Sequence, residues 1–174
     1  EPIENAIHNL NSIINTVTND IKTGAAGLPV DPGEIVVQSY IFITGCGTSP
    51  NFREALDPAY KANRDPKNKP VHLDALKDHL LKNYATVVTQ GCEADDYLAQ
   101  AQTDMSRLYP DMTPVIVTLD KDLYQIPGYK YNFVDKVVEN VSVEEGEKFF
   151  FRQMVLGDKA DNIEGIKGYG EVKT

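Results

Sequence analysis

Seven acidic side chains, in three short stretches of the sequence, have the types and spacing of metal ligands. Like charges repel when they are brought together, so a fold that gathers these carboxylates needs compensating cations. Oxygen-only ligands select hard divalent ions such as Mg²⁺ or Mn²⁺. The pattern therefore predicts a phosphodiesterase site with two such ions. The seven residues are Glu93, Asp95, Asp96, Asp120, Asp122, Asp158 and Asp161.

The spacing within the stretches favours shared ligation. Glu93 and Asp96 are three residues apart at the expected start of a helix, so they share one face. Asp95 points about 100° away from Asp96 and reaches the same ion only from the first turn. Asp158 and Asp161 are again three residues apart, and we expect both to approach one ion.

Each carboxylate taken singly also has a simpler interpretation. Asp95 or Asp96 favours a helix amino end through the helix dipole. Asp120 and Asp158 are suited to cap the turns that follow them. Capping accounts for any one of these residues better than for all three stretches together, because each stretch adjoins an apolar segment.

The predicted chemistry is displacement at phosphorus. One ion lowers the pKa of a bound water, and the second stabilises the leaving oxygen. Lys61 and Arg64 are the candidate side chains to offset charge in the transition state. The histidines lack metal-ligand spacing, and the sequence has no Gly-x-Ser-x-Gly elbow or Walker-type loop.

Residues 51–70 form the one basic stretch, with five basic and three acidic residues. Phe52 and Tyr60 are interleaved with cations that include Arg53. Basic groups beside aromatic rings suit single-stranded or frayed nucleic acid. A solvated loop with two rings beneath it explains the composition equally well.

Three glycines lie in the last stretch, at Gly165, Gly168 and Gly170, with Lys167 among them. Glycines let backbone N–H groups approach a phosphate, especially at a helix amino end. The stretch is also compatible with an ordinary helix–turn–helix corner. Its position after an aspartate pair favours a clamp for a duplex backbone.

Periodicity predicts the elements that position these residues. Strands alternate with helices, which indicates an α/β fold with a parallel sheet. Ligands bind beyond the carboxyl ends of strands in such a sheet, where Glu93 and Asp120 are expected. We expect helices over 3–22, from Leu73, from Glu93 and over 145–156, and strands over 35–44, 85–89, 115–119 and 130–134.

Length and charge bound the rest. The 174 residues are enough for one domain with a real core. The net charge of −9 argues against nucleic-acid binding, although two dications at the predicted site offset part of it. Cys46 and Cys92 form no Cys-x-x-Cys pair, so we expect a reducing, cytoplasmic compartment. No apolar run approaches the ~18 residues of a membrane span, and no secretory signal is visible. The sequence begins at Glu1 without methionine, and we expect a fragment or a processed piece.

The motifs together resemble the 5′→3′ exonuclease and flap endonuclease family, in its bacteriophage and DNA-polymerase-associated branch. The resemblance runs from about Ser39 to the end, and the order and spacing of the motifs agree as well as their content. The motifs are Asn51-Phe52-Arg53, Tyr60-Lys61-Ala62-Asn63-Arg64, Gly91-Cys92-Glu93-Ala94-Asp95-Asp96, Asp120-Lys121-Asp122, Gly157-Asp158-Lys159-Ala160-Asp161-Asn162 and Gly165-Ile166-Lys167-Gly168-Tyr169-Gly170.

The resemblance implies a PIN-like fold over 1–156, without its first strand, and the start of a helix–three-turn–helix DNA clamp over 157–174. It implies that Glu93, Asp95 and Asp96 serve the first ion. The remaining four ligands would serve mainly the second ion: Asp120, Asp122, Asp158 and Asp161. It also implies that Lys61 and Arg64 contact the scissile region, that Tyr60 lies near terminal bases, and that the clamp holds a potassium ion. The sequence departs from the family at Gly45-Cys46-Gly47, where many relatives have an aspartate.

The leading hypothesis is a metal-dependent 5′ nuclease that acts on DNA at 5′ ends, flaps or nicks, in replication or DNA degradation. The alternative from another class is a non-catalytic nucleic-acid-binding module that retains a degenerate site. A PIN-type ribonuclease is the third, and the glycine stretch argues against it.

Overall fold

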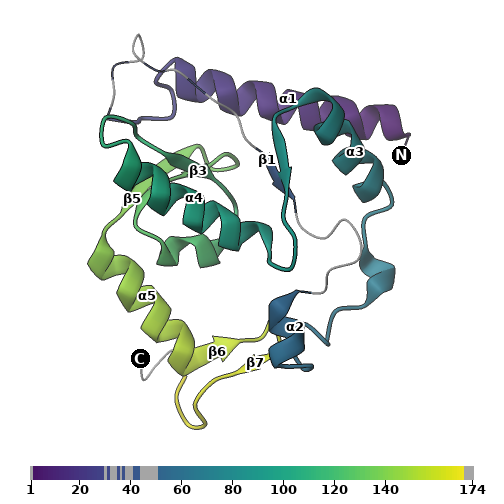
Figure 1. The fold of residues 1–174 in the computed structure, drawn as a ribbon, viewed down its shortest axis with the longest axis vertical. Helices are drawn as coiled ribbons and strands as arrows, with labels where there is room; N and C mark the ends of the chain where they lie inside the picture. The colour runs from purple at the N-terminus through teal and green to yellow at the C-terminus, as the bar shows by residue number, and fades with distance from the viewer. Residues whose placement is uncertain are drawn as a thin grey trace.

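The computed structural model describes residues 2–29, 31, 35, 37, 41–43 and 51–170. Helices alternate with short strands along the chain (Figure 1). The helices are α1 (Ile3–Lys22), α2 (Phe52–Leu56), α3 (Leu73–Asn83), α4 (Ala94–Leu108) and α5 (Val143–Leu156), with 3₁₀ segments η2 (Pro66–Asn68) and η3 (Lys121–Gln125). The strands are β1 (Ile41–Ile43), β2 (Thr86–Val88), β3 (Val115–Val117), β4 (Gly128–Asn132), β5 (Val137–Val141), β6 (Gly157–Asp158) and β7 (Ile163–Glu164).

The described strands form three small sheets, in the orders β1-β2, β3-β4-β5 and β6-β7. β1 pairs with β2 in parallel, and β3 pairs with β4 in parallel. β5 returns antiparallel beside β4, with Gly128 opposite Val141. The α/β class is confirmed. The β3–β4–β5 sheet is mixed rather than wholly parallel, because a short turn with Lys136 at φ 57° makes β4 and β5 a hairpin.

Helix α4 connects the two larger sheets by packing against β1 and β3. Its Gln102 is 3% exposed and donates to the carbonyl oxygens of Pro114 (3.1 Å) and Tyr129 (3.0 Å). The amide oxygen of Gln102 accepts from the buried Lys130 ammonium at 2.6 Å. These bonds satisfy buried polar groups and fix α4 against β4.

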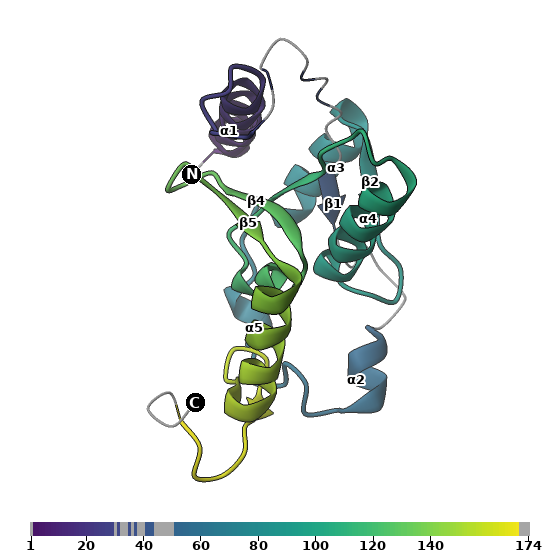
Figure 2. The same cartoon turned by 90° about the vertical axis from the view of Figure 1, so that its left-hand side faces the viewer.

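Helix α1 has the predicted bounds and packs against α3, at the end of the molecule away from α5 (Figure 2). Asn11 accepts from the Tyr84 hydroxyl at 2.8 Å. The buried Asp20 accepts from the Tyr131 hydroxyl at 2.9 Å. Tyrosine hydroxyls from two distant segments thus tie α1 to the rest of the chain. Across the described residues, no helix combines the length and apolar character needed to cross a membrane.

The described part of the C-terminal stretch is a two-stranded hairpin with turns. β6 pairs antiparallel with β7, and Gly157 has a left-handed φ of 72°. A Cβ at Gly165 would lie 2.2 Å from the carbonyl oxygen of Leu156, so close backbone packing requires this glycine. The division at residues 156/157 and the helix–three-turn–helix remain predictions. Part of the expected 35–44 strand and the Gly45-Cys46-Gly47 departure lie outside the described residues.

Candidate active site

The amino end of α4, which follows β2 after a short loop, carries the first acidic group. Asp96 accepts from the backbone N–H of Glu93 at 3.0 Å. It also receives both guanidinium nitrogens of Arg53, each at 2.6 Å. The hydrogen bond from Arg53 lowers the pKa of Asp96. Burial, followed by the charge of Glu93, raises the pKa of Asp95.

Glu93 meets residues from two distant segments. The Lys61 ammonium forms an ion pair with Glu93. The Tyr60 hydroxyl lies 2.8 Å from a carboxylate oxygen of Glu93 and 3.1 Å from one of Asp161. Burial, together with the bond to Glu93, raises the pKa of Tyr60. We name Glu93, Asp95, Asp96 and Asp161 the first carboxylate set.

The second carboxylate set is Asp120, Asp122 and Asp158, gathered where β3 runs into η3. The Lys121 ammonium lies 2.9 Å from Asp122 and 2.8 Å from Asp158. Burial alone lowers the pKa of Lys121, but these hydrogen bonds outweigh burial and raise it. The same bond from Lys121 lowers the pKa of Asp158. Gln153 of α5 donates to Asp122 at 2.5 Å.

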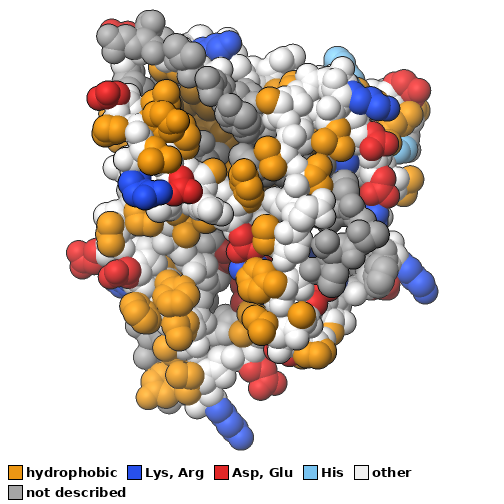
Figure 3. Space-filling model, viewed as in Figure 1, with side chains coloured by type: hydrophobic (Ala, Val, Ile, Leu, Met, Phe, Trp, Pro, Cys, Tyr) orange, Lys and Arg blue, Asp and Glu red, His pale blue; other side chains and the backbone are white. Residues whose placement is uncertain are grey.

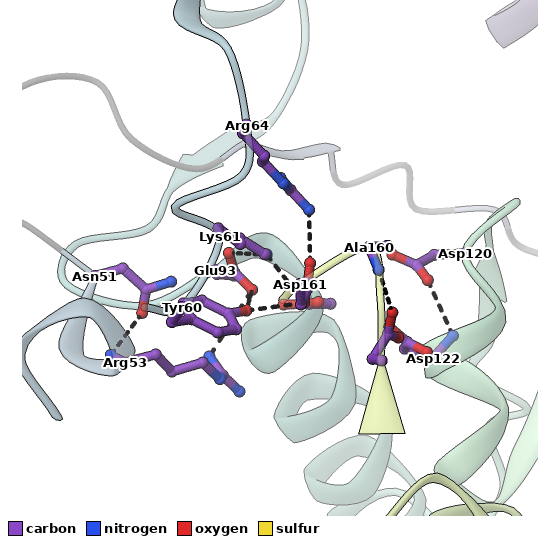
Figure 4. A network of polar contacts seen from close by, with 12 residues as sticks. Asn51, Arg53, Tyr60, Lys61, Arg64, Glu93, Asp120, Asp122, Ala160 and Asp161 are labelled. Atoms are coloured by element: carbon purple, nitrogen blue, oxygen red, sulfur yellow. Dashed lines mark hydrogen bonds and ion pairs between the residues drawn. The ribbon is translucent and has the colours of Figure 1, made fainter. Parts of the chain in front are cut away.

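One loop joins the two sets. Asp158 faces Lys121, whereas Asp161 accepts from Arg64 at 2.7 Å and lies 3.5 Å from the Lys61 ammonium. Figure 4 shows Asp161 with Glu93, Tyr60 and Arg64, and Asp120 with Asp122 beside η3. The two loop aspartates, expected to share one ion, thus contact different cations of the protein. On the face drawn in Figure 3, acidic and basic side chains lie together in a central recess.

The donor chemistry of both sets fits hard divalent ions, because every acidic ligand offers carboxylate oxygen. Within the described ranges, no three His, Cys, Asp or Glu side chains converge closely enough to hold an ion. The ammonium groups of Lys61 and Lys121 instead bridge the carboxylates. The residues therefore fit the ions in ligand type. For the carboxylates to bind the ions, Lys61 and Lys121 must break their ion pairs with them.

Capping, the simpler interpretation, also holds at several positions. Asp120 is the N-cap of η3 and accepts from the Asp122 backbone N–H at 2.9 Å. Glu93 occupies the N-cap of α4, and Asp158 accepts from the Ala160 backbone N–H at 2.8 Å. Capping and ligation are compatible, since a carboxylate that caps a turn keeps further lone pairs.

The predicted DNA-binding residues fall into two places. Arg53 and Tyr60 contact the first carboxylate set, as described above. Gly165 and Lys167 line a pocket of about 450 Å³ near the β6–β7 hairpin. Gly168 has a φ of 88°, and a Cβ at Gly168 or Gly170 would meet open space. The other residues that line the pocket are Leu156, Lys159, Asn162, Ile163 and Glu164.

Several residues at the site escaped the sequence reasoning. Lys121 and Gln153 contact Asp122, and Asn63 and Asn162 connect the basic stretch to the aspartate loop. Lys121, Asn63 and Asn162 lie inside the family motifs named above, and that position is a sequence signal that could have identified them. Nothing in the sequence distinguishes Gln153 from other polar residues of α5.

Comparison with known proteins identifies relatives. The 5′-3′ exonuclease N-terminal resolvase-like domain matches residues 34–154. DNA polymerase I of Borreliella burgdorferi is 30% identical over an alignment of 146 residues, which covers 75% of this chain and 16% of the polymerase. The exonuclease of Escherichia phage T7 is 30% identical over an alignment of 131 residues, which covers 71% of this chain and 42% of that protein. The chain thus spans less than half the length of either relative.

Solved structures agree on the fold. A T5 5′-exonuclease with bound zinc has a TM-score of 0.65 at 20% identity and covers 94% of this chain and 64% of its own. A second structure is the T5 D15 flap endonuclease in a pseudo-enzyme–product complex with DNA and metal ions. It has a TM-score of 0.59 at 19% identity, and the match covers 89% of this chain and 61% of the T5 chain. The PIN-like fold is thereby confirmed. The chain belongs to the 5′-3′ exonuclease family, through its N-terminal resolvase-like domain.

Proposed function

We propose that this chain is part of a metal-dependent 5′→3′ nuclease that hydrolyses DNA phosphodiester bonds at 5′ ends, flaps or nicks. The observation that carries the proposal is the placement of acidic residues from three distant stretches around one loop. Cations from the 51–64 segment face them, so carboxylates for metal ions and cations for phosphate lie together. The DNA polymerase I relative and the DNA complex of the T5 flap endonuclease support DNA as the substrate. We place this nuclease in the cytoplasm.

The ions are Mg²⁺ or Mn²⁺, and there are two. Glu93, Asp95 and Asp96 hold mainly the first, and Asp120, Asp122, Asp158 and Asp161 hold mainly the second. For Asp161 this assignment requires release from Lys61 and Arg64, which it contacts beside Glu93. When bound, such ions supply a hydroxide near neutral pH and stabilise the leaving oxygen. Lys61 and Arg64 turn from their carboxylate partners to the scissile phosphate and offset its charge.

Substrate positioning uses the aromatic and glycine-rich residues. Tyr60 offers a ring to the terminal bases, and Arg53 neutralises a phosphate nearby. Gly165, Lys167, Gly168 and Gly170 approach the duplex backbone, where open space beside two of these glycines leaves room for close contact. A potassium ion at this segment completes the proposed clamp.

A second candidate function is a non-catalytic DNA-binding module. It is favoured by the protein's own ammonium groups, which already form ion pairs within both carboxylate sets. In such a module these ion pairs would persist in the presence of divalent ions, and DNA binding would rely on the remaining cations.

The two functions are separated by incubating the chain with a 5′-labelled flap and a nicked duplex. The nuclease predicts cleavage that requires Mg²⁺ or Mn²⁺ and stops with EDTA. Asp122→Asn should abolish cleavage. The control is Asp104→Asn, which removes a carboxylate that pairs with the exposed Arg107 on α4 and should leave cleavage intact. DNA binding without any metal-stimulated cleavage would establish the module instead.

A further inference from the structure

Two asparagines tie the basic stretch to the aspartate loop by a reciprocal exchange. The side-chain amide of Asn63 donates to the carbonyl oxygen of Lys159 at 3.0 Å. The side-chain amide of Asn162 donates back to the carbonyl oxygen of Ala59 at 2.8 Å. The partners are 96 and 103 residues apart in sequence, so this asparagine clasp is a tertiary contact.

A backbone hydrogen bond lies within the clasp. The N–H of Lys61 donates to the carbonyl oxygen of Asp161 at 2.9 Å. Lys61 and Asn162 both have left-handed backbones, with φ of 55° and 60°. This conformation is unfavourable for a lysine, so the surrounding bonds must hold it. The clasp therefore fixes the backbone from which the Lys61 side chain projects.

The clasp differs in kind from the neighbouring ion pairs. Arg64 and Lys61 contact Asp161 through charge, and ions or phosphate compete for such contacts. The asparagine bonds join neutral amides to carbonyls, which dissolved cations and phosphate displace poorly. When the cations leave their carboxylates, the clasp remains to keep the two segments in register.

We propose that Asn63 and Asn162 are positioning residues that hold the backbone of residues 59–64 against the aspartate loop, so that Lys61 and Arg64 address the scissile phosphate. The proposal rests on the proposed nuclease function. It predicts that the clasp acts on the chemical step rather than on DNA affinity, because neither asparagine is needed to attract the duplex.

The variants that test the clasp are Asn63→Ala and Asn162→Gly. Glycine at 162 removes the amide but keeps the positive φ accessible, which alanine would not. Asn68→Ala, in the exposed η2 segment, is the matched control. Far-UV circular dichroism and the unfolding midpoint confirm that each variant folds.

The first readout is hydrogen exchange, which needs neither metal nor DNA. Protection of the Lys61 amide should fall about five-fold in each variant, since a net hydrogen bond is lost. The Arg64 amide, bonded locally to the Lys61 carbonyl at 3.0 Å, should change less. Wild-type protection should survive about 0.5 M KCl, at which exposed ion pairs are screened. Unchanged Lys61 protection in both variants would overturn the clasp.

The second readout is single-turnover cleavage of a 5′ flap with Mn²⁺. The rate should fall about ten-fold or more in both variants, with the DNA Kd within about two-fold of wild type. Loss of Lys61 protection with an unchanged rate would leave the clasp as a fold contact and refute its positioning role. A wild-type chain that never cleaves would refute the proposed function, while hydrogen exchange would still decide whether the clasp exists.

Discussion

Arg53 and Asp96 form a two-pronged ion pair that joins α2 to α4. The Arg53 nitrogens Nη1 and Nη2 each lie 2.6 Å from a different oxygen of Asp96. The Arg53 guanidinium also lies 4.6 Å from the centre of the Phe52 ring. Planar guanidinium matches a carboxylate in a way that an ammonium cannot. The amino end of α4, which carries the first carboxylate set, is thereby held by a residue 43 positions away.

Arg53→Lys should therefore destabilise the protein without changing its charge. We expect a loss of about 1 kcal/mol in the free energy of unfolding, kept small because both side chains are about one-third exposed. Urea denaturation measures it. Arg107→Lys, at the exposed pair with Asp104, is the control and should show no measurable change. Equal losses in the two variants would contradict a special role for the two-pronged geometry.

Lys121 should substitute for a divalent ion between Asp122 and Asp158. In Lys121→Met these carboxylates lose their shared cation and repel each other. In EDTA the free energy of unfolding should fall by about 0.5–1 kcal/mol after solvent screening, and the melting temperature should fall with it. Mn²⁺ should then raise the melting temperature more than in wild type, because ligand binding to the folded state restores the compensation. Lys148→Met on α5 should respond to Mn²⁺ as wild type does. A Mn²⁺ response of Lys121→Met equal to or smaller than the wild-type response would contradict the substitution.

Lys130 should make stability rise with alkaline pH. Burial lowers the pKa of Lys130 from 10.5 to about 8, while its ammonium bonds Gln102 and backbone carbonyls. Between these pH values the unfolded chain binds more protons than the folded chain, so the free energy of unfolding rises with pH. The free energy of unfolding of wild type, measured relative to that of Lys130→Met, should rise by about 2 kcal/mol from about pH 7.5 to about pH 9.5.

Urea denaturation at several pH values checks this difference, in which the other titrating groups cancel. Lys148→Met, at an exposed lysine, should run parallel to wild type across the same range. Parallel curves for Lys130→Met and wild type would show that Lys130 titrates alike in the folded and unfolded chains.

Local rules predicted much of the fold. Apolar spacing predicted α1 up to Lys22, and the structure ends α1 there. The start of α4 after Glu93 and the cap at Asp120 also follow from residue type and neighbours. β5 was missed because Glu139 and Asn140 interrupt its apolar residues, and its pairing with β4 makes it a strand.

Long-range pairing limited the prediction of the site. That the seven carboxylates serve one site remains a prediction, and the sequence did not indicate which cations contact them. Lys61 and Glu93 are 32 residues apart, and Asp161 and Arg64 are 97 apart. Spacing on one helix or loop gives the direction of a side chain, but partners at such separations depend on how the segments pack. Asp158 and Asp161 therefore face different cations despite a favourable spacing.

The central claim is that the two carboxylate sets act together in one metal-dependent nuclease site. Its most direct test is the Mn²⁺-dependent cleavage rate of a 5′ flap by Glu93→Gln, Asp158→Asn and the double variant. Each single change should reduce the rate about 100-fold or more, and the double variant should be little worse, because residues that act as a unit are not additive. Wild-type cleavage by either single variant would contradict the claim.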